Sequence, residues 1–163
     1  MDLTYGFGGV QTELKLYPVL NNDLSKNRKR NIRFSYEQIP FRDQSMNLVL
    51  FDPPFAIDNL NSQQAVFDAY HGMNPAFATY KYGAYSDVQR MRKSLYLTFR
   101  EIRRILVPGG LCVFKWCDTA KSFSWVRAIF LTDFTMERVT VRRSTAYSNH
   151  ATFFIYLRSP VKR

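Results

Sequence analysis

The residues best suited to chemistry are Asp52, Pro53, Pro54 and Phe55, which directly follow an apolar run at residues 46–51. The run is typical of a buried β-strand. Neither proline can donate a hydrogen bond to a sheet, and Pro54 keeps Pro53 extended. We therefore expect a stiff segment with one carboxylate, several carbonyls and an aromatic ring at the carboxyl end of a strand. We call this stretch, residues 52–55, the DPPF segment.

Ligands of open α/β sheets bind outside the carboxyl ends of the strands, so the DPPF segment is a candidate binding site. Its acceptor groups suit a ligand that donates N–H groups, and the Phe55 ring suits stacking on a flat molecule. A strand followed by an ordinary proline turn would share these four residues. The rest of the chain has to distinguish an amine-binding site from a turn.

Four stretches of the chain carry a resemblance to a known family. The DPPF segment resembles the (D/N/S)-P-P-(Y/F/W) motif of amino-methyltransferases that use S-adenosylmethionine and modify exocyclic amines of nucleic-acid bases. Residues 1–9 resemble the first motif of these enzymes, Asp-x-Gly-x-Gly-x-Gly, with Thr4 in place of the first glycine. The tripeptides at residues 81–83 and 114–116 are most similar to small phage-type DNA methyltransferase-like proteins. The family resemblance covers nearly the whole chain.

The resemblance implies a set of residues that bind S-adenosylmethionine: Asp2, Thr4, Gly6, Gly8, Asp23 and Ser35. Glycines at positions 6 and 8 let the backbone approach a ligand closely. Asp23 would accept hydrogen bonds from the cofactor ribose. Ser35 stands where many of these enzymes have an acid that meets the cofactor adenine. Only Met1 precedes Asp2, so the first strand is expected to be truncated.

The resemblance also implies the reaction. The catalytic residues would be Asp52, Pro53, Pro54 and Phe55, with Asp52 and the Pro53 carbonyl accepting hydrogen bonds from the target amine. Adenine N6 in DNA is the favoured target. The alternatives are a base of ribosomal or transfer RNA, or a non-catalytic homologue that binds nucleic acid as the subunit of an active partner. No metal site is implied.

The spacing of apolar and turn residues predicts the remaining elements. Ser86 is expected to cap a long helix that Pro108-Gly109-Gly110 ends, with its arginines and lysine as solvated charges. Residues 56–85, polar and then aromatic, are expected to form a substrate-side loop or lid whose rings stack on bases. The other expected elements are helices at residues 11–17 and 122–130 and strands at residues 19–23, 32–34, 111–116, 136–142 and 151–157.

Composition limits the class of protein. The chain has 163 residues, with 23 Lys and Arg against 13 Asp and Glu, and this balance of +10 favours a polyanionic partner. No run is long enough to span a membrane, and the two cysteines suggest reduced thiols in a cytoplasmic protein. A homodimer or a partner subunit stays open. We expect one domain, residues 1–163, with an α/β, Rossmann-like class I methyltransferase fold: a mostly parallel twisted sheet, helices on both faces, and an antiparallel C-terminal strand pair.

Overall fold

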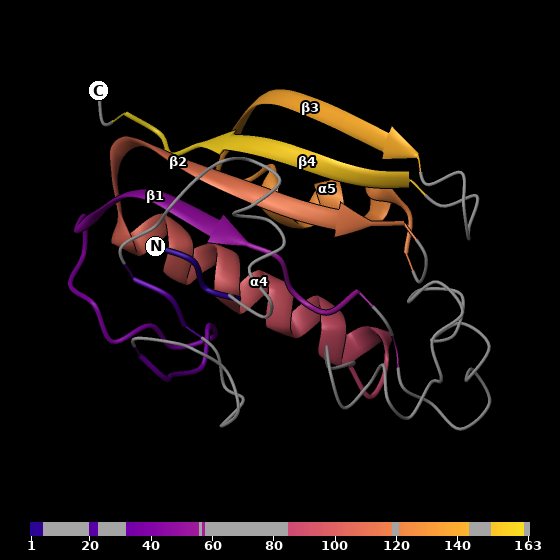
Figure 1. The fold of residues 1–163 in the computed structure, drawn as a ribbon, viewed down its shortest axis with the longest axis horizontal. Coiled ribbons are helices and arrows are strands. Elements are labelled where there is room, and N and C mark those ends of the chain that lie inside the picture. Colours follow the sequence, from indigo (N-terminus) through magenta and orange to yellow (C-terminus); the bar gives the residue numbers. More distant parts are fainter. Residues whose placement is uncertain are drawn as a thin grey trace.

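A computed structural model of the chain describes residues 1–4, 20–22, 32–55, 57, 85–118, 121–143 and 151–161. Four strands form its sheet, in the order β1-β2-β4-β3. Strands β1 and β2 are parallel, and β4 is antiparallel to both of its neighbours (Figure 1). The strands are β1 (Met46–Phe51), β2 (Leu106–Cys117), β3 (Thr135–Arg143) and β4 (Ala151–Arg158).

Three short segments extend this sheet beyond β1. Asp2 forms parallel bridges to Leu50 on one side and to Asn21 on the other, and Asn22 forms a parallel bridge to Ile32. The spatial order is therefore Ile32, residues 21–22, Asp2, β1, β2, β4 and β3. The predicted truncated first strand is confirmed within the described residues, because Asp2 is the one residue of segment 1–4 that forms a bridge. The mostly parallel sheet and its antiparallel closing pair are confirmed as well.

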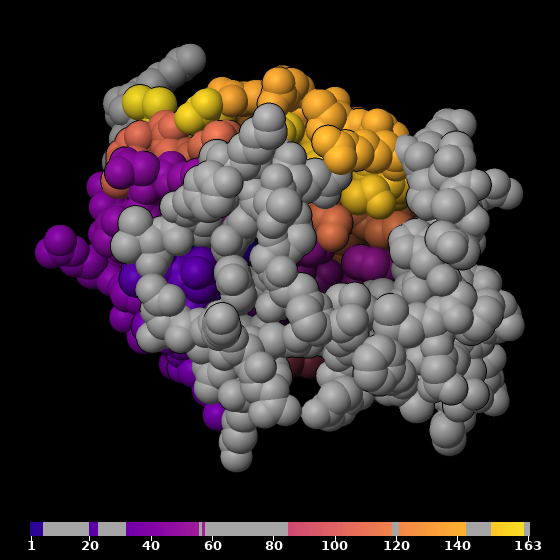
Figure 2. All heavy atoms as spheres, in the orientation of Figure 1, coloured from indigo at the N-terminus to yellow at the C-terminus, as the bar shows by residue number. Residues whose placement is uncertain are grey.

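Two helices, α4 (Val88–Ile105) and α5 (Phe123–Phe130), pack on one face of the sheet. Alternation along β2 creates that face: Phe114 and Trp116 are buried against the helices, whereas Val113 lies in a separate small cluster with Leu50. Fully burying a side chain of this size stabilises the fold by roughly 1.5–3 kcal/mol. The predicted helix at residues 11–17 lies outside the described residues. Strand β3 forms one edge of the sheet, and its atoms line the upper rim of the face shown in Figure 2.

Two predicted boundaries of α4 are wrong. Asp87, not Ser86, is the N-cap: its carboxylate accepts a hydrogen bond from the Arg90 N–H at 2.7 Å, and the Ser86 hydroxyl donates to the same carboxylate. The helix ends at Ile105, before Pro108-Gly109-Gly110, and β2 begins at Leu106. Pairing with neighbouring strands decides this boundary, because Leu106 pairs with Met46 and the carbonyl of Gly110 accepts from the Ser159 N–H.

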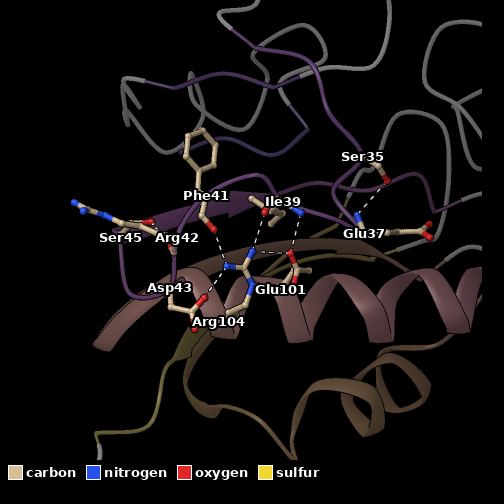
Figure 3. Close-up of polar contacts among 9 residues, drawn as sticks. All are labelled: Ser35, Glu37, Ile39, Phe41, Arg42, Asp43, Ser45, Glu101 and Arg104. Carbon is tan, nitrogen blue, oxygen red and sulfur yellow. Dashed lines mark hydrogen bonds and ion pairs between the residues drawn. The ribbon is translucent and has the colours of Figure 1, made fainter.

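The arginines of α4 are not all solvated, which corrects a further expectation. Arg104 donates to the Glu101 carboxylate, to the Asp43 carboxylate and to the carbonyls of Ile39 and Phe41, with distances of 2.6–2.9 Å (Figure 3). These contacts hold the segment before β1 against the helix, and we call them the Arg104 cluster. They raise the pKa of Arg104 and lower that of Glu101. Arg90 pairs with Glu37 and Arg103 with Asp133 elsewhere on α4.

None of the described helices is both long enough and apolar enough to cross a membrane.

Candidate active site

The DPPF segment leaves β1 at the carboxyl end of the strand, beside residues of two neighbouring segments. Strand β1 has the predicted bounds, residues 46–51, and its last two residues are fully buried. The parallel register pairs Phe51 with Phe114, so the residues that follow them, Asp52 and Lys115, come side by side. On the other side of β1, Leu3 donates its N–H to the Leu50 carbonyl at 2.9 Å, which brings Thr4 to the same edge.

Asp52 is held at two points. Its main-chain N–H donates to Thr4 Oγ1 at 2.6 Å, and its carboxylate oxygen Oδ2 accepts from Lys115 Nζ at 2.8 Å. The side chains of Asp52 and Lys115 are each 23% exposed, so the ion pair is largely withdrawn from solvent. In the part of the chain that the structure describes, no hydrogen bond reaches the other oxygen, Oδ1. Asp52 therefore presents one carboxylate oxygen for a ligand.

The rest of the DPPF segment is only partly accessible. Pro53 is buried, whereas Pro54 and Phe55 are half-buried. The Phe55 ring packs against the edge of the main core, which fixes its position without covering it completely. The segment is thus a supported surface, as its two prolines predict.

Two of the three described members of the predicted cofactor set, Asp2 and Thr4, lie in segment 1–4. Asp2 is 2% exposed, and its Oδ1 accepts from the Thr4 N–H at 2.9 Å. The Ser35 hydroxyl accepts from the Glu37 N–H at 3.2 Å, on an exposed turn. Gly6, Gly8 and Asp23 lie outside the described residues. Of the described positions, Thr4 is the one that contacts the DPPF segment, because it bonds to both Asp2 and Asp52.

Two residues that sequence reasoning missed organise this edge. Asn22, which is 1% exposed, donates to the carbonyls of Leu3 and Phe34 and accepts from the Phe34 N–H, so one amide ties three strand segments together. Lys115 is the other. The clue to Lys115 was a lone charge in the otherwise apolar β2 run, directly after the last residue of β2 that pairs with β1.

The ends of the predicted lid, residues 56–85, are fixed beside the site. Ile57 forms a parallel bridge to Tyr85, and the Tyr85 hydroxyl lies 3.4 Å from that of Tyr36. Tyr85 is 5% exposed, so it is an anchor of the fold rather than one of the predicted stacking rings, and burial raises its pKa well above the usual range. The residues between, including 81–83, lie outside the described part of the chain.

The two cysteines, Cys112 and Cys117, are buried thiols. Burial raises the pKa of the Cys112 thiol, so this residue stays protonated and is a poor nucleophile.

Comparison with known proteins identifies the fold. Neither protein-family models nor curated protein sequences match the chain. Solved structures do. The PH0226 protein from Pyrococcus horikoshii has a TM-score of 0.59 and 15% identity, over 97% of this chain and 80% of its own. A protein from Methanosarcina mazei described among S-adenosylmethionine-dependent methyltransferases has a TM-score of 0.57 and 13% identity, over 99% and 92%.

Together with the strand order, these similarities show that the chain has the class I methyltransferase fold. The fold by itself does not fix the chemistry. The [4+2]-cyclase SpnF matches with a TM-score of 0.58 and 9% identity, over 99% of this chain and 75% of its own. The reaction has to be inferred from the site.

Proposed function

We propose that this chain is an S-adenosylmethionine-dependent N-methyltransferase that acts on an exocyclic amine of a nucleic-acid base, with adenine N6 in DNA as the favoured target. One observation carries the proposal. The Asp52 carboxylate is fixed at the carboxyl edge of a methyltransferase-type sheet, with one oxygen left for a ligand, beside two prolines and an aromatic ring.

The residues present fit the cofactor. Bound S-adenosylmethionine would supply an electrophilic methyl group. Asp2 and Thr4 lie in the strand segment beside β1, next to the DPPF segment. A cofactor bound at Asp2 and Thr4 and an acceptor amine bound at the DPPF segment would therefore share one edge of the sheet. Gly6, Gly8, Asp23 and Ser35 complete the proposed set. Thr4 would stand between the two ligands.

The DPPF segment would make the amine reactive. The lone pair of a base amine is delocalised into the ring, so the amine is a poor nucleophile. Hydrogen bonds from its two N–H groups to Asp52 and to the Pro53 carbonyl favour a tetrahedral nitrogen and localise the lone pair. An amine that accepts the methyl group would become strongly acidic and would release its proton to solvent. Positioning and electrostatics therefore provide the catalysis.

Nucleic acid fits the remaining features. The balance of +10 favours a polyanion, and the half-buried Phe55 ring offers a face for a flipped base. Residues 56–85 are proposed as a substrate-side lid that closes over the base. We propose a cytoplasmic location for a protein with this role. RNA is the alternative polyanion with the same amine chemistry.

The decisive experiment compares methyl transfer from labelled S-adenosylmethionine to DNA and to RNA over a range of salt concentrations. Transfer to adenine N6 of DNA is expected, with substrate affinity that falls steeply as salt rises. Gly8→Val should abolish cofactor binding in calorimetry while the protein stays folded. Transfer to neither polymer would contradict the proposal, and transfer to RNA alone would move the target to the alternative.

A non-catalytic homologue that binds nucleic acid is the second candidate. Two departures favour it: Thr4 in place of a glycine, and Ser35 in place of an acid, with its hydroxyl engaged by the Glu37 N–H. A homologue of this kind would bind DNA or RNA and show no heat of binding with S-adenosylmethionine. Calorimetry with the cofactor alone thus separates the two functions.

A further inference from the structure

Lys115 contacts the key carboxylate from a strand to which the proposed function assigns no role. It lies in β2 between Phe114 and Trp116, both fully buried on the helix-covered face. Its own side chain projects from the opposite face and forms the 2.8 Å ion pair with Asp52. An isolated cation so close to an apolar core is costly unless it is paired, and here its partner is the proposed catalytic acid.

The ion pair with Lys115 gives the two carboxylate oxygens of Asp52 different roles. The terminal torsion of an aspartate is broad, so an unpaired carboxylate would sample many orientations. Lys115 holds Oδ2, and Thr4 holds the main-chain N–H of the same residue from the other side of β1. Asp52 is therefore fixed by both neighbouring segments of the sheet, and Oδ1 keeps a single orientation.

We propose that Lys115 is a positioning residue for methyl transfer. It locks the Asp52 carboxylate so that Oδ1 accepts one N–H of the acceptor amine, while the second N–H goes to the main-chain carbonyl of Pro53. This inference rests on the proposed function and sharpens it. The carboxylate contributes one hydrogen bond rather than two, and the amine is oriented by two different acceptors.

Lys115 acts on orientation and not on the binding of nucleic acid. Its ammonium is already engaged by Asp52 and lies beside the buried end of β2, whereas phosphate-binding lysines present an exposed, hydrated ammonium. A misplacement of about 1 Å at a reacting group costs on the order of a hundredfold in rate. Loss of the lysine should therefore reduce kcat and leave KM for the oligonucleotide nearly unchanged.

The experiment compares Lys115→Met, Lys115→Arg, Asp52→Asn and the double variant Lys115→Met/Asp52→Asn with the wild type. The matched control is Lys93→Met, which removes the same charge from the exposed surface of α4. Each protein is assayed for kcat and KM on the oligonucleotide that the wild type methylates, for S-adenosylmethionine binding by calorimetry, and for unfolding in urea.

We expect Lys115→Met to lower kcat on the order of a hundredfold with unchanged cofactor affinity, and Lys115→Arg to recover part of the rate. The double variant should be no slower than the slower single variant, because both changes disable one device. Wild-type kcat in Lys115→Met would overturn the inference and leave the function standing. A raised KM at unchanged kcat would overturn it too, since it would make the lysine a phosphate contact. A wild-type enzyme without methyl transfer would overturn the function and the inference together.

Discussion

An ion pair holds each end of β1. The two pairs differ in whether an acceptor oxygen remains for a ligand. At the amino end, the Arg104 cluster directs the guanidinium to two carboxylates and two carbonyls of the chain itself. At the carboxyl end, Lys115 engages one oxygen of Asp52, and no hydrogen bond within the described ranges engages the other. The partners of the Arg104 cluster all come from the chain itself, whereas Asp52 keeps one oxygen that can accept a hydrogen bond from a ligand.

The difference separates stability from chemistry. Hydrogen bonds to charged groups that the fold fully satisfies tie segments together and rigidify them. A carboxylate that is held firmly but satisfied only in part is preorganised for a hydrogen-bond donor that arrives later. Loss of a contact at the amino end of β1 should therefore lower stability and leave turnover unchanged. Loss of a contact at the carboxyl end should chiefly lower turnover.

The largest effect is expected from Asp52→Ala. Removing an acceptor that acts mainly in the transition state should lower kcat by a factor on the order of a hundred or more. Cofactor affinity should change little, whereas the free energy of unfolding should fall, because Lys115 loses its partner beside the apolar core. Asp43→Ala makes the same change at the other end of β1 and should keep normal turnover. Steady-state kinetics of the two variants checks the contrast, and an Asp52→Ala enzyme with full turnover would reduce the DPPF segment to a proline turn.

Arg104→Met should give the opposite result. Its loss removes the donor that the Glu101 and Asp43 carboxylates and two carbonyls share, although Glu101 keeps its hydrogen bond from the Ile39 N–H. We expect a cost of about 2 kcal/mol of unfolding free energy after allowance for the 30% exposure of the Arg104 side chain. Turnover per folded molecule should be preserved. Urea titration measures the first quantity and kinetics the second. An unchanged free energy of unfolding would show that the Arg104 cluster does not stabilise the protein in solution.

Thr4→Val tests the smaller contact at the carboxyl end. The variant keeps the shape of the side chain and removes the oxygen that accepts from the Asp52 N–H. We expect kcat to fall about tenfold, the scale of one hydrogen bond. Thr4→Ser retains the hydroxyl and is the control. Equal rates for valine and serine at this position would mean that the main-chain contact does not position Asp52.

The smallest expected effect is a change in unfolding free energy at acidic pH. The hydrogen bonds from Arg104 lower the pKa of Glu101, so its contribution to stability is present above the ordinary glutamate pKa of about 4.3 and is lost as pH falls through the lower folded value. The wild type should therefore exceed Glu101→Gln in unfolding free energy near pH 6. The difference in unfolding free energy between the two proteins should become smaller as the pH falls below about 4.5. Denaturant curves at several pH values test this, and a gap that is constant with pH would contradict it.

Local patterns predicted much of the fold. The apolar run before Asp52 predicted β1 with the observed bounds, and the helical spacing predicted the body of α4. Boundaries that depend on pairing did not follow from the sequence. Pro108-Gly109-Gly110 reads as a helix stop, yet it belongs to β2, because neighbouring strands provide its hydrogen-bond partners.

The candidate site was predictable only in part, for the same reason. The DPPF segment is contiguous and therefore visible in the sequence. Lys115 belongs to the site through the register of two parallel strands, which no local pattern specifies. Thr4 was expected to serve the cofactor, and its bond to Asp52 likewise depends on which segments the sheet places side by side.

The bridge between Ile57 and Tyr85 has a consequence for how this protein could change over time. The bridge fixes the distance that any connection between these two residues has to span. The entropy of loop closure grows slowly with length, so doubling the length of a flexible connection costs only about 0.6 kcal/mol. A connection of a different length could therefore join Ile57 to Tyr85 at little cost in closure entropy. Insertions at this place could then change what binds beside the DPPF segment without altering the sheet edge that holds Asp52.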